Sequence, residues 1–391
     1  MTHRIDRIET FVVDAYRANY VFVRISTADG LHGVGEGTVE HREKAVAAAI
    51  EEFSPTILGQ DAFNTEALVE RMIRDSYWRT GVVIRSAVAA IEAALLDIKG
   101  KALGVPVYQL LGGAFRDRTP VYGNAWFTGA KTAEDFAQKA RIAVADGWKA
   151  LKWDPFGTAW LRLERAGMNR AMAIIGAVRD AVGPDIELMI EGHGRFDVPA
   201  AISIAEEMAR FRPYWFEEPL PPESITALAD VRARTRVPVA TGERYYELHR
   251  FIELINADAV DYLQPDVTHV GGLGEAKKIA AFAHAHYLPI CPHNPLGPIA
   301  NAMTLHLAAA TPNFAWLETM VSDVPWRSEI VREDCIIEAG EMLVPQGPGL
   351  GVDIDVEACT KRPPGTYSLR HYGGALTAIR PLDARPFYTR R

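Results

Sequence analysis

Apolar and polar positions alternate over the first part of the chain, in the pattern of extended strands. The alternating apolar positions are Ile8, Phe11, Val13, Val21, Val23 and Ile25, and Asp29-Gly30 follows them as a hairpin signal. From about residue 42 the period becomes helical, and residues 86–101 (SAVAAIEAALLDIKGK) form a nearly continuous apolar helix before Gly112-Gly113. The pattern therefore predicts an α+β unit over residues 1–118, with an antiparallel sheet followed by helices.

After Pro120 short apolar runs that end in polar residues alternate with helical segments. The eight runs are 121–124, 150–154, 186–191, 214–217, 237–243, 260–266, 288–293 and 314–318. Such alternation is typical of a TIM-like (β/α)7-8 barrel, here expected over residues 119–325, although no clear eighth helix follows the last run. Residues 326–391 are richer in Gly and Pro, and we expect them to return to the first unit and complete it as a cap.

Composition narrows the classes of function. The 391 residues are 48% hydrophobic and 24% charged, as in ordinary globular proteins. A formal net charge of −8 argues against a nucleic-acid partner. Three cysteines without CxxC spacing, no secretory signal and no long apolar segment predict a cytoplasmic protein that does not bind membranes.

Three glutamates end three successive strand runs at equal spacing. Glu217 follows Glu191 by 26 residues, and Glu243 follows Glu217 by 26. Since a barrel spends roughly 31 residues on each strand–helix unit, this step returns to the same height on the next strand, at the mouth where barrel active sites lie. Three converging carboxylates repel one another unless a cation joins them, and oxygen ligands favour Mg²⁺. Any one of these acids taken alone is equally well explained as a helix cap.

The same series of strand ends continues with groups suited to proton transfer. Asp266 ends the next run and His293 the one after, so the carboxylate can orient the imidazole as a general base. His193 stands two residues after Glu191 and shares its face of the strand, although a fourth metal ligand or a packing role is the alternative. Glu318 and Lys152 end two further runs and are candidates to contact substrate, with a surface lysine as the alternative for Lys152.

These residues in this order resemble the mandelate racemase branch of the enolase superfamily over essentially the whole chain. The resemblance implies that Glu191, Glu217 and Glu243 bind the metal and that His293 and Asp266 form the branch's His–Asp pair. The segments ALKWDPFG (150–157), MIEGHGRF (189–196) and PHNPLGP (292–298) are similar to gluconate and galactonate dehydratases. The implied function is a Mg²⁺-dependent acid-sugar dehydratase that forms a 2-keto-3-deoxy acid, with His193 as the second catalytic histidine.

One departure separates the chain from the racemases of this branch. These carry Lys-x-Lys on the second strand, whereas Asp154 replaces the second lysine here, and we expect it to contact substrate. A racemase or epimerase of a 2-hydroxy acid is the alternative enzyme, and a barrel that binds without catalysis is the alternative of another class. From the cap, Arg17, Tyr20, Trp78 and Arg79 are candidates to contact the distal end of a small sugar acid, and ordinary surface or cap-core positions are the alternative for each. The resemblance also implies a homo-oligomer.

Overall fold

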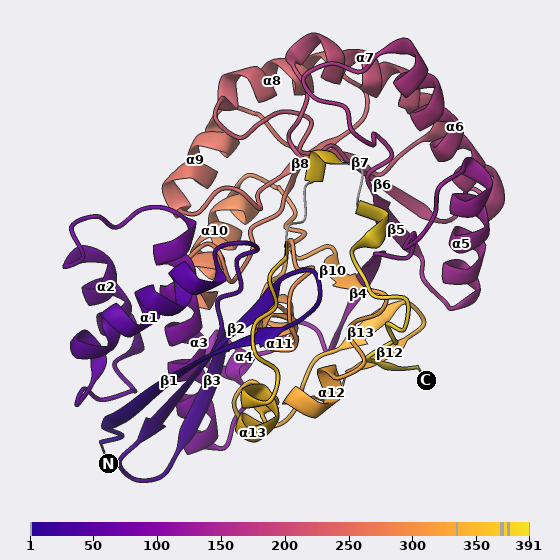
Figure 1. Ribbon diagram of the computed structural model, residues 1–391. Helices are drawn as coiled ribbons and strands as arrows, with labels where there is room; N and C mark the ends of the chain where they lie inside the picture. The colour runs from indigo at the N-terminus through magenta and orange to yellow at the C-terminus, as the bar shows by residue number, and fades with distance from the viewer. Residues whose placement is uncertain (1, 334, 368–370, 374–375, 391) are drawn as a thin grey trace.

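The N-terminal unit is a three-stranded antiparallel sheet with helices packed on it. The computed structural model describes residues 2–333, 335–367, 371–373 and 376–390 (Figure 1). The sheet has the order β1-β2-β3. Its elements and the helices that follow are β1 (Ile5–Asp14), β2 (Asn19–Thr27), β3 (His32–Glu36), α1 (Glu43–Ile57), α2 (Thr65–Arg74), α3 (Val82–Leu103) and α4 (Val107–Leu110).

Small residues let α3 approach the sheet closely. Gly33, Gly35 and Gly37 recur at every second position of β3 and just beyond it, and a Cβ atom at each would collide with a backbone carbonyl oxygen of α3. The apolar helix predicted over residues 86–101 is the buried middle of α3. This contact fixes β3, and with it the loop at residues 37–42, against the rest of the molecule.

A closed parallel barrel follows, as the sequence predicted. Its strands are β4 (Arg118–Asn124), β5 (Ala150–Trp153), β6 (Glu187–Glu191), β7 (Trp215–Glu217), β8 (Val239–Thr241), β9 (Tyr262–Leu263) and β10 (Leu317–Met320). Each of β4 to β9 pairs with the next, and β10 pairs with β4. The gap between β9 and β10 is closed at Ile290, which forms parallel bridges to Leu263 and Phe314. Each of the eight predicted runs therefore contributes to the barrel wall.

Helices surround the barrel on its outer side (Figure 1). They are α5 (Ala133–Ala145), α6 (Arg165–Val182), α7 (Val198–Met208) with the 3-10 turn η1 (Ala209–Phe211), α8 (Ile225–Arg234), α9 (Leu248–Asn256), α10 (Leu273–Ala285) and α11 (Pro298–Ala309). The helix that comes directly after β10 is the short α12 (Arg327–Ile330), in keeping with the missing eighth helical pattern. In the part of the chain that the structure describes, no helix is long and apolar enough to cross a membrane.

The C-terminal segment joins the cap to the barrel. Its strand β13 pairs with β4 of the barrel, whereas α13 packs against β1 of the cap. Tyr372, Leu376 and Ile379 reach the cavity at the barrel mouth. The elements are β11 (Val331–Arg332), β12 (Ile336–Glu338), β13 (Glu341–Leu343), β14 (Asp353–Ile354), α13 (Val356–Thr360), η2 (His371–Gly373), η3 (Leu376–Ala378) and β15 (Thr389–Arg390).

Candidate active site

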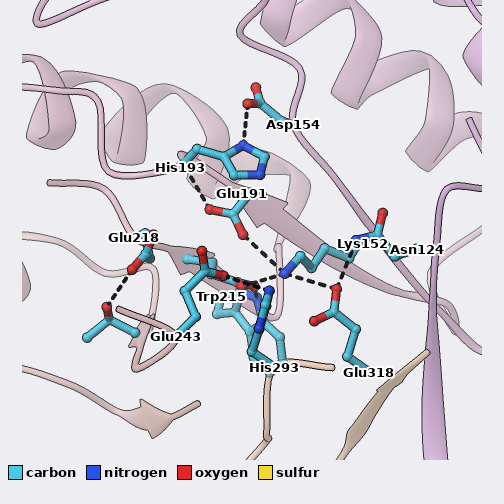
Figure 2. A network of polar contacts seen from close by, with 12 residues as sticks. Asn124, Lys152, Asp154, Glu191, His193, Trp215, Glu218, Glu243, His293 and Glu318 are labelled. Atoms are coloured by element: carbon cyan, nitrogen blue, oxygen red, sulfur yellow. Dashed lines mark hydrogen bonds and ion pairs between the residues drawn. The ribbon is translucent and has the colours of Figure 1, made fainter. Parts of the chain in front are cut away.

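Three glutamates meet at the carboxyl ends of neighbouring strands. Glu191 and Glu217 are the last residues of β6 and β7 and are partners in the parallel register. Glu243 lies just beyond β8. One carboxylate oxygen from each lies within 4.8 Å of the others, and Glu191 and Glu217 are buried. The equal spacing in the sequence thus corresponds to one cluster in space (Figure 2).

Lys152 of β5 supplies positive charge to this cluster. Its Nζ atom lies 3.1 Å from a Glu191 oxygen, 2.5 Å from Glu217 and 3.1 Å from Glu318 (Figure 2). Although burial favours the neutral amine, these carboxylates raise the pKa of Lys152 well above its usual value. Lys152 is therefore a buried ammonium ion rather than a surface side chain.

The cluster still carries more negative than positive charge. Burial, and after it the nearby Glu191 carboxylate, raises the pKa of Glu217 well above its ordinary value, although Lys152 acts in the opposite direction. Carboxylate oxygens from three neighbouring strand ends are the ligands that a hard divalent cation such as Mg²⁺ prefers. The three glutamates fit such an ion by their number, chemistry and mutual distance.

His293 and Asp266 form a hydrogen-bonded pair beside the cluster. His293 Nδ1 lies 2.7 Å from Asp266 Oδ2, and His293 Nε2 lies 3.3 Å from Glu243. Thr268 holds the other Asp266 oxygen through its backbone N–H at 2.8 Å and its hydroxyl at 2.6 Å. Burial lowers the pKa of His293, but the Glu243 carboxylate and the Asp266 hydrogen bond outweigh it and raise this pKa to about 9.

His193 lies on the turn that follows β6. Its φ of 49° is in the left-handed region, and its backbone N–H donates to Glu191 Oε1 at 2.6 Å. Its Nδ1 atom lies 2.7 Å from Asp154 Oδ2, an oxygen that also accepts from Arg195. Burial lowers the pKa of His193. The side chain lines the same cavity as Glu191, Glu243 and His293.

The remaining candidates differ in how close they lie to the cavity. Glu318 accepts hydrogen bonds from the Asn124 side chain at 2.8 Å and from the Asn294 backbone at 3.0 Å. Arg17 lines the cavity and forms an ion pair with Glu40. Tyr20 is absent from the residues that line the cavity, and its hydroxyl donates to Asp323 at 2.6 Å.

Two further cap candidates lie away from the cavity. Trp78 is 81% exposed, Arg79 is also exposed, and neither is among the described residues that line it. Both belong to the segment between α2 and α3, which ends next to Val82, a residue of the cavity wall. The structure therefore does not bring Trp78 and Arg79 to the other candidates.

Several cavity residues were not identified from the sequence. His269 donates from Nε2 to the Thr38 carbonyl at 3.1 Å, and its Nδ1 lies 3.4 Å from Asp266 Oδ2. Glu218, next to Glu217, is buried and forms an ion pair of 2.6 Å with Arg244. The sequence did place each of them close to a predicted residue, and this was the signal that could have identified them. His269 lies three residues after Asp266, Glu218 directly follows Glu217, and Arg244 directly follows Glu243.

Comparison with known proteins agrees with this geometry. The family described as mandelate racemase / muconate lactonizing enzyme, N-terminal domain, matches residues 5–112. The family described as enolase C-terminal domain-like matches residues 135–358. Together the two matches cover the cap and most of the barrel.

Among curated relatives, the D-gluconate dehydratase of Thermoproteus tenax is 35% identical over 351 residues, which cover 89% of this chain and 71% of that protein. The D-galactonate dehydratase of Ralstonia pickettii is 36% identical over 86% of this chain and 89% of its own length. Among solved structures, a mandelate racemase/muconate lactonizing enzyme-like protein from Rubrobacter xylanophilus is 36% identical. It superposes with a TM-score of 0.85 over 93% of this chain and 98% of that one.

Proposed function

Because this chain belongs to the mandelate racemase/muconate lactonizing enzyme branch of the enolase superfamily, we propose that it is a Mg²⁺-dependent dehydratase of a sugar acid. Two relatives named D-gluconate and D-galactonate dehydratase support the substrate class. The observation that carries the proposal is one cavity lined by two carboxylate-bonded histidines and by Glu191 and Glu243. In Figure 2 the two imidazoles lie on either side of Glu191.

Each of the two histidines carries out one proton transfer with the substrate. His293, oriented by Asp266, removes the proton from C2 of the sugar acid, which leaves an enediolate. His193 then gives a proton to the 3-hydroxyl as the C3–O bond breaks, so that water leaves. The resulting enol takes up a proton at C3 and becomes the 2-keto-3-deoxy acid. Overall, one sugar acid yields one keto acid and one water.

The residues around the cluster stabilise the negative charge that removal of the C2 proton adds to the substrate. A proton next to a carboxylate is weakly acidic, because its removal creates a second negative charge on the substrate. Glu191, Glu217 and Glu243 would hold Mg²⁺, which when bound supplies electrostatic stabilisation to that charge. Lys152 keeps a fixed positive charge beside Glu191 and Glu217. Closure of the cavity by the cap excludes water from the intermediate.

The product of the reaction tests this proposal. Purified protein is incubated with a panel of sugar acids that includes D-gluconate and D-galactonate, with Mg²⁺ or with EDTA, and keto acid is measured. We expect keto acid from at least one sugar acid, only with the metal, and none from a folded His293→Asn variant. If no member of the panel yields keto acid with Mg²⁺, the dehydratase assignment is wrong.

The alternative enzyme, an epimerase, forms the same enediolate. Its product distinguishes it from a dehydratase. Two histidines that line one cavity can serve opposite faces of C2, which keeps this alternative open. In D₂O an epimerase returns the starting acid and its C2 epimer with deuterium at C2. A dehydratase accumulates keto acid, and this is the outcome we expect.

A further inference from the structure

We propose that Asp154 is a positioning residue for His193, and that Arg195 and Tyr372 hold this pair in place. The proposal rests on the proposed function, in which His193 gives a proton to the leaving hydroxyl. It differs from the expectation that Asp154 contacts substrate.

Both oxygens of Asp154 are already engaged within the protein. Oδ1 accepts the backbone N–H of Phe156 at 2.8 Å. Oδ2 lies 2.7 Å from His193 Nδ1 and accepts from the Arg195 guanidinium. The carboxylate is buried and is fixed on three sides, so it is arranged to orient an imidazole rather than to bind a sugar hydroxyl.

Arg195 ties this carboxylate to the backbone around His193. The guanidinium is fully buried, and its Nε donates to the Gly192 carbonyl at 2.9 Å while Nη1 donates to the Gly157 carbonyl at 2.8 Å. Gly192 directly precedes His193, and Gly157 lies on the loop after β5. Arg195 thus holds Asp154 and the peptide before His193 in one rigid unit.

Tyr372 secures His193 from the C-terminal segment. Its hydroxyl donates to the His193 carbonyl at 3.0 Å, and its ring lies 5.2 Å from the Arg195 guanidinium carbon. His193 has a φ of 49°, a conformation that non-glycine residues adopt only when their surroundings fix it. The contacts from Glu191, Arg195 and Tyr372 provide that restraint.

The consequence is a defined proton position on the imidazole. With Nδ1–H donated to Asp154, the proton that His193 exchanges with substrate is carried by Nε2. His293 has the same arrangement, since its Nδ1 lies 2.7 Å from Asp266. The cavity therefore contains two carboxylate–histidine pairs, one for each proton transfer of the proposed reaction.

The test compares two reactions of one variant. Asp154→Asn keeps the size of the side chain, but its amide can donate to Nδ1 and so stabilise the wrong tautomer. We expect kcat for keto acid from D-gluconate or D-galactonate to fall about 10²- to 10⁴-fold, the usual contribution of one acid–base group. We expect exchange of the C2 proton in D₂O to continue, because His293 and Asp266 are unchanged.

Two matched variants serve as controls. Asp266→Asn should lose both the exchange and the dehydration, since it disturbs the other pair. Asp353→Asn removes a similar contact, the 2.8 Å bond to His32 at the partly exposed edge of the cap, and should change neither. Thermal unfolding of each variant checks that it is folded.

A second readout does not depend on turnover. In protein with ¹⁵N-labelled histidine, wild-type His193 should carry its proton on Nδ1, and Asp154→Asn should shift it toward Nε2, with His193→Asn identifying the signal. The positioning role would be overturned if Asp154→Asn left dehydration unchanged, or raised KM at unchanged kcat. It would also be overturned if the variant lost exchange and dehydration equally, or if the His193 tautomer did not change. If the wild-type protein acts on no sugar acid, the proposed function fails, and the tautomer measurement still decides the role of Asp154.

Discussion

Three buried carboxylates share the charge of Lys152. Its contacts to Glu191, Glu217 and Glu318 place it at the centre of the site. Removing one partner of a buried ion cluster leaves the others uncompensated, which is far more costly than losing an exposed ion pair. The stability of the metal-free protein should therefore depend on this residue.

We predict that Lys152→Gln lowers the unfolding free energy of the metal-free protein by about 3–5 kcal/mol. Mg²⁺ should then stabilise the variant more than the wild type, because the ion replaces part of the missing charge. Denaturant unfolding in EDTA and in Mg²⁺ measures both effects, with Lys149→Gln on the exposed side of the neighbouring turn as the control. Equal stability of Lys152→Gln and wild type in EDTA would show that the lysine does not compensate the cluster.

At this scale the sequence predicted the glutamate cluster and the contact between His293 and Asp266, but not the contacts of Asp154. Strand-end spacing was enough to predict that Glu191, Glu217 and Glu243 face one region, because a repeating fold converts spacing into height. It did not reveal that Asp154 faces Arg195 and His193, since their sequence separations of 41 and 39 residues follow no repeat. Contacts of this kind depend on side-chain packing, which a single sequence does not specify.

The sequence predicted where the strands of the barrel lie, but it did not predict how each of them is hydrogen-bonded to its neighbours. The run 288–293 forms isolated bridges from Ile290 to Leu263 and Phe314 rather than a strand. Pro289 and Pro292 flank that residue, and proline has no N–H to donate to a strand ladder. The apolar pattern thus placed the segment in the wall, and the prolines limited its pairing.

Helix α11 joins the barrel to two other segments through His306. Nδ1 accepts the backbone N–H of Tyr108 in α4 at 3.2 Å, and Nε2 donates to the Leu350 carbonyl at 3.1 Å. Only the neutral imidazole can accept the first of these bonds. Burial lowers the pKa of His306 from 6.5 to about 4.

We predict that this histidine makes the protein acid-sensitive. Its contribution is complete above the unfolded pKa of 6.5 and is lost as the pH falls toward the folded pKa of about 4. At pH 5 the loss is about 2 kcal/mol relative to pH 7. His306→Gln, which offers one donor and one acceptor, should lose less stability between pH 7 and pH 5.

Denaturant unfolding of metal-free protein at the two pH values measures this difference. His284→Gln, at an exposed position of the neighbouring helix α10, should keep the wild-type pH dependence. An identical pH dependence for His306→Gln and wild type would show that the buried imidazole does not titrate as described.

Across the whole molecule, the cap, the barrel and the C-terminal segment meet at the buried carboxylate of Asp323. Tyr20 of β2 donates to Oδ2 at 2.6 Å, Arg327 of α12 donates to the same oxygen at 2.6 Å, and Arg380 lies 3.7 Å from Oδ1. Burial raises the pKa of Asp323, but Arg380 and Arg327 outweigh it and lower this pKa. Tyr20 thus joins parts of the molecule that enclose the cavity.

This junction explains why the cap residues were the hardest to assign. Tyr20 and Asp323 are 303 positions apart, and no periodic pattern links them. The return of the C-terminal segment to the cap could be predicted from its composition and from the family resemblance. Its second contribution, the placement of Tyr372 against His193, required the folded structure.

We propose that Glu191, Glu217 and Glu243 together hold one divalent cation at the barrel mouth. Calorimetric titration of Mg²⁺ into EDTA-treated protein tests it most directly. We predict one bound ion per chain in the wild type and loss of that binding in a folded Glu217→Gln variant. Absence of binding to the wild type, or equal affinity in the variant, would show that these three glutamates do not form a metal site.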